Sequence, residues 1–219
     1  MRNINLIFIG FLLITSSLFS QEVVEQKKET KEEKRAHYTT AIMIVPQIAA
    51  VNGMRIDFEF RTGKNAIVIA PTYYSKINYD DYYDYKKMNG AGLDLAYKFN
   101  LINPNKVFVP YAAANLSYDY FSVDAINNIY EYYDEFGNYS PNYDLTKVGI
   151  HKVGLDALMG FQITPIPRFV IDFCIGVGTR HSFAESEKDL VKENFSEEIL
   201  DMAYSGIIPT CNFKIGIKL

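Results

Sequence analysis

Several residue types on which enzymes and metalloproteins depend are scarce in this chain. It has two cysteines, three histidines and no tryptophan. No CxxC, HExxH, phosphate-loop or dinucleotide-binding motif occurs, so the sequence gives no support to metal or nucleotide chemistry. We therefore expect no metal and no cofactor. The formal net charge of −4 gives no electrostatic reason to expect nucleic-acid binding.

Long apolar runs are also missing beyond the N-terminus. No later run approaches the roughly 18 apolar residues that a membrane-spanning helix needs, so any span must be made of strands. The chain begins with Arg2, the apolar run Leu6–Ile14 and the small polar residues of Thr15–Ser20, which is the layout of a secretory signal peptide. We expect a cleaved signal peptide at residues 1–20, a charged periplasmic linker at 21–37 and a single folded domain at 38–219.

An unbroken alternation of apolar and charged side chains occupies residues 54–61. Successive side chains of a strand face opposite sides, so this strand has one apolar face and one ionic face. A soluble barrel would turn the apolar face inward, whereas a membrane-spanning barrel turns it toward lipid. The apolar members are Met54, Ile56, Phe58 and Phe60, and the charged members are Arg55, Asp57, Glu59 and Arg61.

Eight such runs follow the linker, and the links between them differ in length. The links after the second, fourth and sixth runs are short turns, while those after the third, fifth and seventh are long, at about residues 77–90, 122–149 and 182–205. The sequence therefore predicts an all-β fold: an eight-stranded antiparallel up-and-down transmembrane β-barrel with short periplasmic turns and long extracellular loops. The runs are residues 38–49, 54–61, 66–76, 92–100, 107–121, 151–164, 169–181 and 206–219.

The signal peptide, the eight runs, the long-loop pattern and the terminal strand Asn212–Leu219 resemble the small eight-stranded outer-membrane proteins of the OmpA transmembrane-domain and OmpX type. The resemblance implies a place in the bacterial outer membrane, among its lipids and lipopolysaccharide, and assembly by the barrel-assembly machinery. It also implies that the alternating apolar residues of the last strand are the assembly signal. These residues are Phe213, Ile215, Ile217 and Leu219.

The predicted register turns six acids and seven bases into the lumen. A barrel of eight strands is just wide enough to be filled by side chains, and unpaired charges there would be costly. We therefore expect a network of ion pairs and hydrogen bonds with trapped water that plugs the lumen; a narrow passive pore is the alternative. The charges are Arg55, Asp57, Glu59, Arg61, Asp94, Lys98, Asp119, Lys152, Asp156, Asp172, Arg180, Lys214 and Lys218.

The expected loops are rich in tyrosine and acid, which suits contact with an extracellular glycan or protein ligand. The alternative is that the tyrosines lie at the membrane rim below a solvated acidic loop. The last loop has apolar residues at helical spacing, which predicts a short helix over the barrel mouth. The binding candidates are Asp80, Asp81, Tyr82, Tyr83, Asp84, Tyr132, Tyr133 and Asp134, and the helix residues are Val191, Phe195, Ile199 and Met202.

The adjacent His181 and Ser182, with Glu185 nearby, superficially suggest a hydrolase triad. Neighbouring strand residues face opposite sides, so we expect a non-enzymatic protein with a structural or interactive role, such as envelope integrity, adhesion or surface binding. A lipid-modifying enzyme and a soluble lipocalin-like barrel remain as alternatives. The same register places Cys174 inside and Cys211 toward lipid, which would preclude a disulfide, whereas a register shifted by one residue would permit it.

Overall fold

The computed structural model describes residues 40–78, 85–133, 139–166, 168–184, 195–196 and 201–219, with the backbone alone for 127–143. The expected signal peptide and the whole charged linker lie outside these ranges. Tyr38–Leu219 forms one compact unit. Within the described ranges, no helix is long and apolar enough to cross a membrane.

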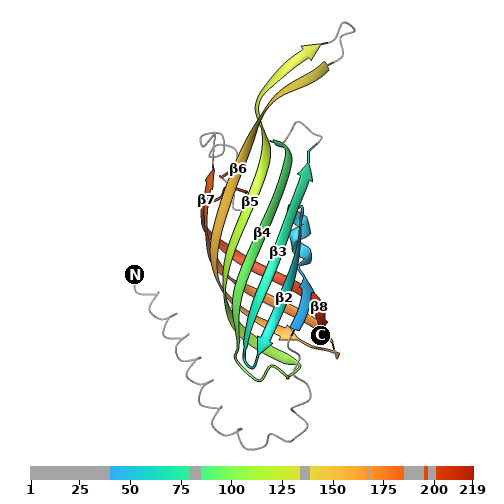
Figure 1. The fold of residues 1–219 in the computed structure, drawn as a ribbon, viewed down its shortest axis with the longest axis vertical. Helices are drawn as coiled ribbons and strands as arrows, with labels where there is room; N and C mark the ends of the chain where they lie inside the picture. The colour runs from blue at the N-terminus through green and yellow to red at the C-terminus, as the bar shows by residue number, and fades with distance from the viewer. Residues whose placement is uncertain (1–39, 79–84, 134–138, 167, 185–194, 197–200) are drawn as a thin grey trace, which may run out of the picture. The chain divides into compact units, whose positions relative to one another are not determined.

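Eight antiparallel strands form a closed ring in chain order, with β1 pairing with both β2 and β8 (Figure 1). The predicted eight-stranded up-and-down barrel is thereby confirmed. The strands are β1 (Thr40–Ile44), β2 (Gly53–Thr62), β3 (Asn65–Ile77), β4 (Tyr85–Asn100), β5 (Phe108–Tyr133), β6 (Tyr139–Ile163), β7 (Phe169–Ala184) and β8 (Gly206–Lys218).

The barrel has two unlike ends. The turn end has the short connections at residues 63–64, 101–107 and 164–168, together with the start of β1 and the end of β8, where Leu219 N–H donates to Thr40 O at 2.9 Å. The loop end is where β3, β5 and β7 end and where β4, β6 and β8 begin. There β5 and β6 continue beyond the other strands as a two-stranded ribbon (Figure 1).

The long connections are shorter than the sequence predicted. Residues 122–149 were expected to be a loop, but β5 runs to Tyr133 and β6 starts at Tyr139. The pairing continues without a break from Ser122↔Gly149 to Ile126↔Leu145, and a bulge follows before Asn128. Likewise β4 starts at Tyr85, within the predicted 77–90 loop. Backbone pairing thus continues well past the residues that our alternation pattern marked.

The first strand was also predicted wrongly. It ends at Ile44, and the 3-10 helix η2 (Pro46–Val51) occupies the rest of the expected 38–49 run. Proline cannot donate to a strand ladder, so Pro46 ends the pairing. Asn52 then takes a left-handed conformation with φ of 59° and leads into β2.

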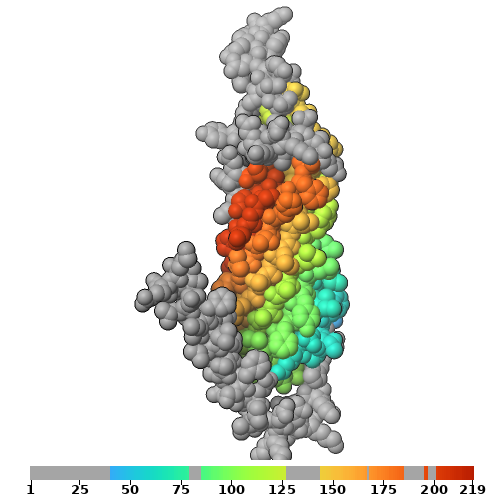
Figure 2. Space-filling model, turned by 90° about the vertical axis from the view of Figure 1, so that its left-hand side faces the viewer, coloured from blue at the N-terminus to red at the C-terminus, as the bar shows by residue number. Residues whose placement is uncertain are grey.

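Apolar side chains cover the outside of the barrel wall, and charged ones fill the inside. Leu95 is 45 % exposed and Leu155 59 %, whereas Asp57 and Glu59 are 0 % exposed. This inside-out distribution is that of a barrel whose outer surface meets lipid. Figure 2 shows the strands from β8 (red) through β7 (orange) to β4 (green) as a wall of inclined stripes.

Aromatic side chains gather outside at both borders of the apolar belt. Toward the turn end, Phe108 stacks on Phe161 with 5.3 Å between ring centroids. Toward the loop end, His151 stacks on Phe183 at 5.1 Å and bonds to Tyr118 OH at 2.7 Å. Aromatic girdles of this kind mark the two interfaces of membrane barrels, and here they lack tryptophan.

Candidate functional site

The barrel interior holds all thirteen charged side chains that the sequence placed in the lumen. Arg55, Asp119, Lys152 and Arg180 are partly exposed there. The other nine are buried: Asp57, Glu59, Arg61, Asp94, Lys98, Asp156, Asp172, Lys214 and Lys218.

The first cluster of these charges lies near the turn end and centres on Glu59. Its buried carboxylate accepts from Arg61 at 2.6 Å and from Lys98 Nζ at 3.0 Å. Lys98 also donates to Asp172 at 2.6 Å, and its ammonium lies 3.8 Å from the ring centroid of Tyr111. These contacts join β2, β4, β5 and β7, so the cluster spans the lumen from wall to wall.

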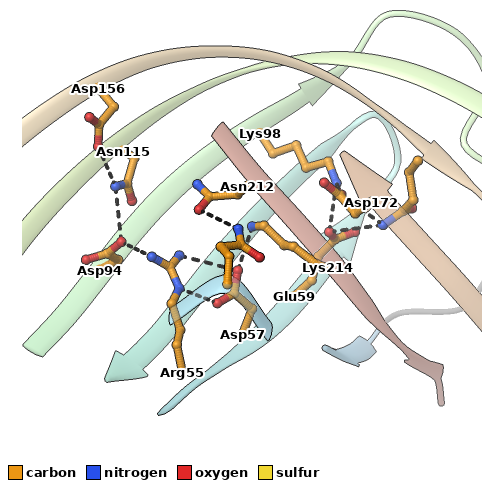
Figure 3. Close-up of polar contacts among 12 residues, drawn as sticks. Arg55, Asp57, Glu59, Asp94, Lys98, Asn115, Asp156, Asp172, Asn212 and Lys214 are labelled. Carbon is orange, nitrogen blue, oxygen red and sulfur yellow. Dashed lines mark hydrogen bonds and ion pairs between the residues drawn. The ribbon is translucent and has the colours of Figure 1, made fainter. Parts of the chain in front are cut away.

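A second cluster follows toward the middle of the barrel, between β2, β4 and β8. Asp57 is fully buried and accepts from Arg55 Nε at 2.6 Å and from Lys214 Nζ at 2.6 Å. Arg55 also forms an ion pair with Asp94. In Figure 3 the Arg55 guanidinium lies between the Asp57 and Asp94 carboxylates. Asp57 belongs to β2 and Asp94 to β4, the two neighbours of β3 in the ring. Arg55 therefore links acids from both sides of β3.

Asn115 extends the second cluster to the other half of the ring (Figure 3). Its side-chain amide donates to Asp156 at 2.9 Å and to Asp94 at 3.3 Å. Arg180 in turn holds Asp156 with two bonds, at 2.7 and 3.2 Å. Such a two-bond pair fixes both side chains. Strands β5, β6 and β7 are thereby included in the network.

Glycines on the inner wall make room for these ions. A Cβ atom on Gly178 would lie 1.8 Å from Asp156 Oδ1, and one on Gly92 would lie 2.0 Å from Asp119 Oδ1. Any larger residue at either position would displace a carboxylate. The sequence shows these glycines, but only the structure shows what they accommodate.

Above the network, Lys152 and Asp119 occupy opposite positions on β6 and β5. Lys152 Nζ donates to Asp201 O at 2.8 Å, and Asp119 accepts from Tyr74 OH at 3.4 Å. Lys152 thus ties the segment before β8 to the inner wall. These are the last charges before the interior changes character.

An apolar cluster closes the interior toward the loop end, and the sequence analysis did not predict it. Phe195 is 3 % exposed, lies 6.0 Å from the Tyr85 ring, and accepts a backbone bond from Ala203 at 2.8 Å. Phe195 had been assigned to a helix over the mouth. Most of that segment lies outside the described residues, but Phe195 and the partly buried Met202 do pack here. The buried members are Met88, Phe121, Val123, Ala125, Val148, Ile150, Phe195 and Ala203.

Most loop-binding candidates lie outside the described residues. Those are Asp80, Asp81, Tyr82, Tyr83, Asp84 and Asp134. Tyr132 and Tyr133 belong to β5, so their assignment to a loop was wrong. The ladder extends to Tyr133↔Tyr139, which makes this region part of a strand ribbon.

The other residues singled out in the sequence are distributed over the wall. His181 is exposed on the outer face and Ser182 faces inward, since β7 continues to Ala184, so the two side chains do not meet. Cys174 is buried and Cys211 exposed, and both are free thiols. Phe213, Ile215, Ile217 and Leu219 all lie at the outer side of β8 and its end, where Leu219 is 64 % exposed. Among described residues, no group of three or more His, Cys, Asp or Glu side chains could hold a metal ion.

Comparisons with known proteins add a likeness of structure. No family model matches the chain, and neither does any curated protein. Among solved structures, the chain is similar to Neisserial surface protein A, with a TM-score of 0.41 and 12 % sequence identity. The match covers 82 % of this chain and 92 % of that one.

Proposed function

We propose that this protein is a non-enzymatic outer-membrane barrel whose lumen is plugged by side chains. In this role it presents the β5–β6 ribbon and the loops to the extracellular medium. Its surroundings are outer-membrane lipid and lipopolysaccharide, and its assembly uses the barrel-assembly machinery. The work we assign to it is structural or interactive, through an extracellular glycan or protein ligand.

The observation that carries this proposal is the filled interior. Two ionic clusters cross the lumen, and the apolar cluster around Phe195 lies above them. Each ion in the clusters has a partner of opposite charge, so moving one aside leaves another buried and unpaired. A lumen built in this way favours rigidity over transport. We therefore assign the function to the outer surface of the barrel.

The most prominent part of that surface is the β5–β6 ribbon. From Ile126 to Leu145 it extends past the other strands, and its two strands pair with each other. A ribbon that projects from a rigid barrel suits a contact away from the membrane, since its position is fixed by the barrel wall.

Excising the ribbon tests this proposal. In the shortened variant an Asn-Gly turn joins Ala125 to Thr146, which face one another in the ladder. Both proteins should fractionate with the outer membrane and change gel mobility on boiling. Only the full-length protein should then make cells bind to an immobilised glycan array or to epithelial monolayers. Equal binding by the two proteins would contradict the assigned role of the ribbon.

Two rival functions have distinct outcomes in the same preparations. A passive pore would give single-channel conductance in a planar bilayer. A lipid-modifying enzyme would change the acyl pattern of outer-membrane lipids, and would lose that activity on His181→Ala or Ser182→Ala substitution. A protein extracted without detergent that shows no mobility change on boiling would contradict membrane insertion altogether.

A further inference from the structure

Each of the three short connections at the turn end contains one base and no acid. The bases are Lys64 between β2 and β3, Lys106 between β4 and β5, and Arg168 between β6 and β7. Lys106 and Arg168 are exposed, and Lys64 is partly exposed. Because the strands follow one another in ring order, these connections lie at every second interval round the lower end of the barrel in Figure 1. We call the three residues the turn-end bases.

The connections at the loop end have the opposite composition. Residues 78–84 and 134–138 contain acids and no base, and acids outnumber bases in residues 185–205. The charges of the connecting segments are thus divided by sign between the two ends of the barrel. An anion is therefore attracted by the connections of the turn end and repelled by those of the loop end.

Backbone contacts fix the turns on which the bases lie. Lys64 O accepts twice from Asn100, from the backbone N–H at 2.8 Å and from the side-chain amide at 3.0 Å. Arg168 O accepts from the backbone N–H of Lys218 at 2.7 Å. These turns are therefore anchored to the strands beside them, and the positive charges have fixed positions on the rim of the barrel.

The turn-end bases lie just beyond the aromatic border of the lipid-facing belt. Lys106 is two residues before Phe108, which is 51 % exposed. Lys64 adjoins Asn65, whose partner on β4 is Phe99, with 42 % exposure. Two residues of strand span about 7 Å. Since aromatic side chains mark the edge of the hydrocarbon layer, bases at this distance beyond them lie at the level of the lipid headgroups.

Exposed apolar side chains lie beside the bases on the same connections. Val107 and Ile166 are each 61 % exposed, and Leu101 is 40 % exposed. A lipid layer accommodates both kinds of group, because apolar side chains enter its acyl boundary while the bases extend to the phosphates. Free phosphate would satisfy the bases and leave the apolar side chains in water. Boundary lipids also surround a barrel on every side, which matches the spacing of the bases round the ring.

We propose that the turn end binds the phosphate groups of anionic phospholipids in the periplasmic leaflet through the turn-end bases. The inference rests on the proposed insertion of the barrel in the outer membrane. A zwitterionic headgroup presents an ammonium group together with its phosphate, so it gains less from nearby bases than an anionic headgroup does. The turn end therefore selects lipids by their net charge, whereas the apolar belt above it contacts acyl chains without regard to headgroup.

Spin-labelled lipids measure this preference. The protein is reconstituted in phosphatidylcholine vesicles that contain a trace of phosphatidylglycerol or phosphatidylcholine labelled near the end of one acyl chain. Electron paramagnetic resonance then gives the fraction of each lipid immobilised at the protein. We expect the association constant of phosphatidylglycerol to exceed that of phosphatidylcholine about twofold, and the excess to fall as salt is added. Equal association constants in the unaltered protein would overturn the proposal, and that comparison requires no variant.

Two matched double variants locate the preference. Lys106→Gln/Arg168→Gln removes two positive charges from the turn end and should remove most of the excess binding of phosphatidylglycerol. Lys87→Gln/Lys147→Gln removes the same charge from exposed positions on either side of Asp124 at the loop end, and should leave the excess unchanged.

Both variants are compared in preparations that show the gel shift on boiling. An unchanged excess in the turn-end variant would overturn the assignment to the turn-end bases. Absence of the gel shift in the unaltered protein would instead contradict the proposed membrane barrel itself.

Discussion

Toward the turn end, β5 places Tyr111 and Asn115 inside the barrel and Leu116 against the outside. Toward the loop end the same strand places the fully buried Val123 inside and the polar Asp124 outside, where it faces Lys147 of β6. Side chains still alternate between the two faces of the strand, but here the apolar ones face inward and the polar ones outward. The first arrangement is that of a barrel in lipid and the second that of a soluble protein. The change marks where the wall leaves the membrane.

The ionic half and the apolar half of the interior should also differ in how much a substitution lowers the free energy of unfolding. In the two ionic clusters each charged group contacts a group of opposite charge, and removal of one leaves the others buried without that partner. In the apolar half the loss is one of packing. The following substitutions separate these two contributions to stability. Each is measured by unfolding the protein with urea in lipid vesicles, with the gel shift as the readout of the folded fraction.

Glu59→Ala should have the largest effect. It leaves the buried Arg61 and Lys98 without the carboxylate that both contact, and we expect a loss of about 4 kcal/mol. Glu59→Gln preserves an acceptor and serves as the control, with a smaller loss. A loss below about 1 kcal/mol for the alanine variant would mean that water reaches this cluster freely.

Phe121→Ala should come next, with a loss of about 3 kcal/mol. Phe121 is 6 % exposed, and its ring lies 5.0 Å from that of Tyr74. Tyr118→Ala on the outer face of the same strand is the control, because its ring is 44 % exposed. If the two variants lose equal stability, the apolar cluster does not act as a packed core.

A polar side chain placed in the apolar half, or an apolar one placed in the ionic half, should lower the stability of the barrel. Ile150→Gln introduces a buried amide into the apolar cluster, and Gln162→Ile removes an acceptor 2.7 Å from Arg61. We expect a loss of about 2 kcal/mol from each. A neutral Ile150→Gln variant would contradict the contrast between the halves.

Gly178→Ala should have the smallest effect, about 1 to 2 kcal/mol, since the new methyl group forces Asp156 away from its place beside Arg180. Val177→Ala, at an exposed outward position on the same strand, is the control and should cost less. A larger loss at Val177 would mean that the outer surface, and not the ion pair, limits stability.

How far the sequence predicts this barrel depends on the rule that was applied. The alternation at residues 54–61 placed Arg55, Asp57, Glu59 and Arg61 on one face, and the structure has them on the inner face. The rule looked for apolar residues outside and polar residues inside. It therefore missed the ends of β5 and β6, where Val123 and Val148 face inward. A rule that accepts any alternation of apolar and polar residues, whichever kind faces outward, would have identified these strand ends.

The remaining differences depend on contacts between segments that are distant in the chain. The end of β1 follows from Pro46, yet nothing in the sequence shows that Gln47 would pair with Phe213. Nor does spacing show that Arg180 would select Asp156, or that Phe195 would pack against strands β4 to β6. These pairings are set by closure of the ring, which brings together residues of every strand.

Conductance in a planar lipid bilayer tests the central claim most directly, that the interior is filled from the ionic clusters to the apolar cluster. Purified protein that shows the gel shift on boiling is inserted, and current is recorded in a monovalent salt with voltage applied in both directions. The account predicts no current steps above those of the lipid alone. Reproducible single-channel steps that change in size with Lys98→Ala would contradict it and assign the lumen to transport.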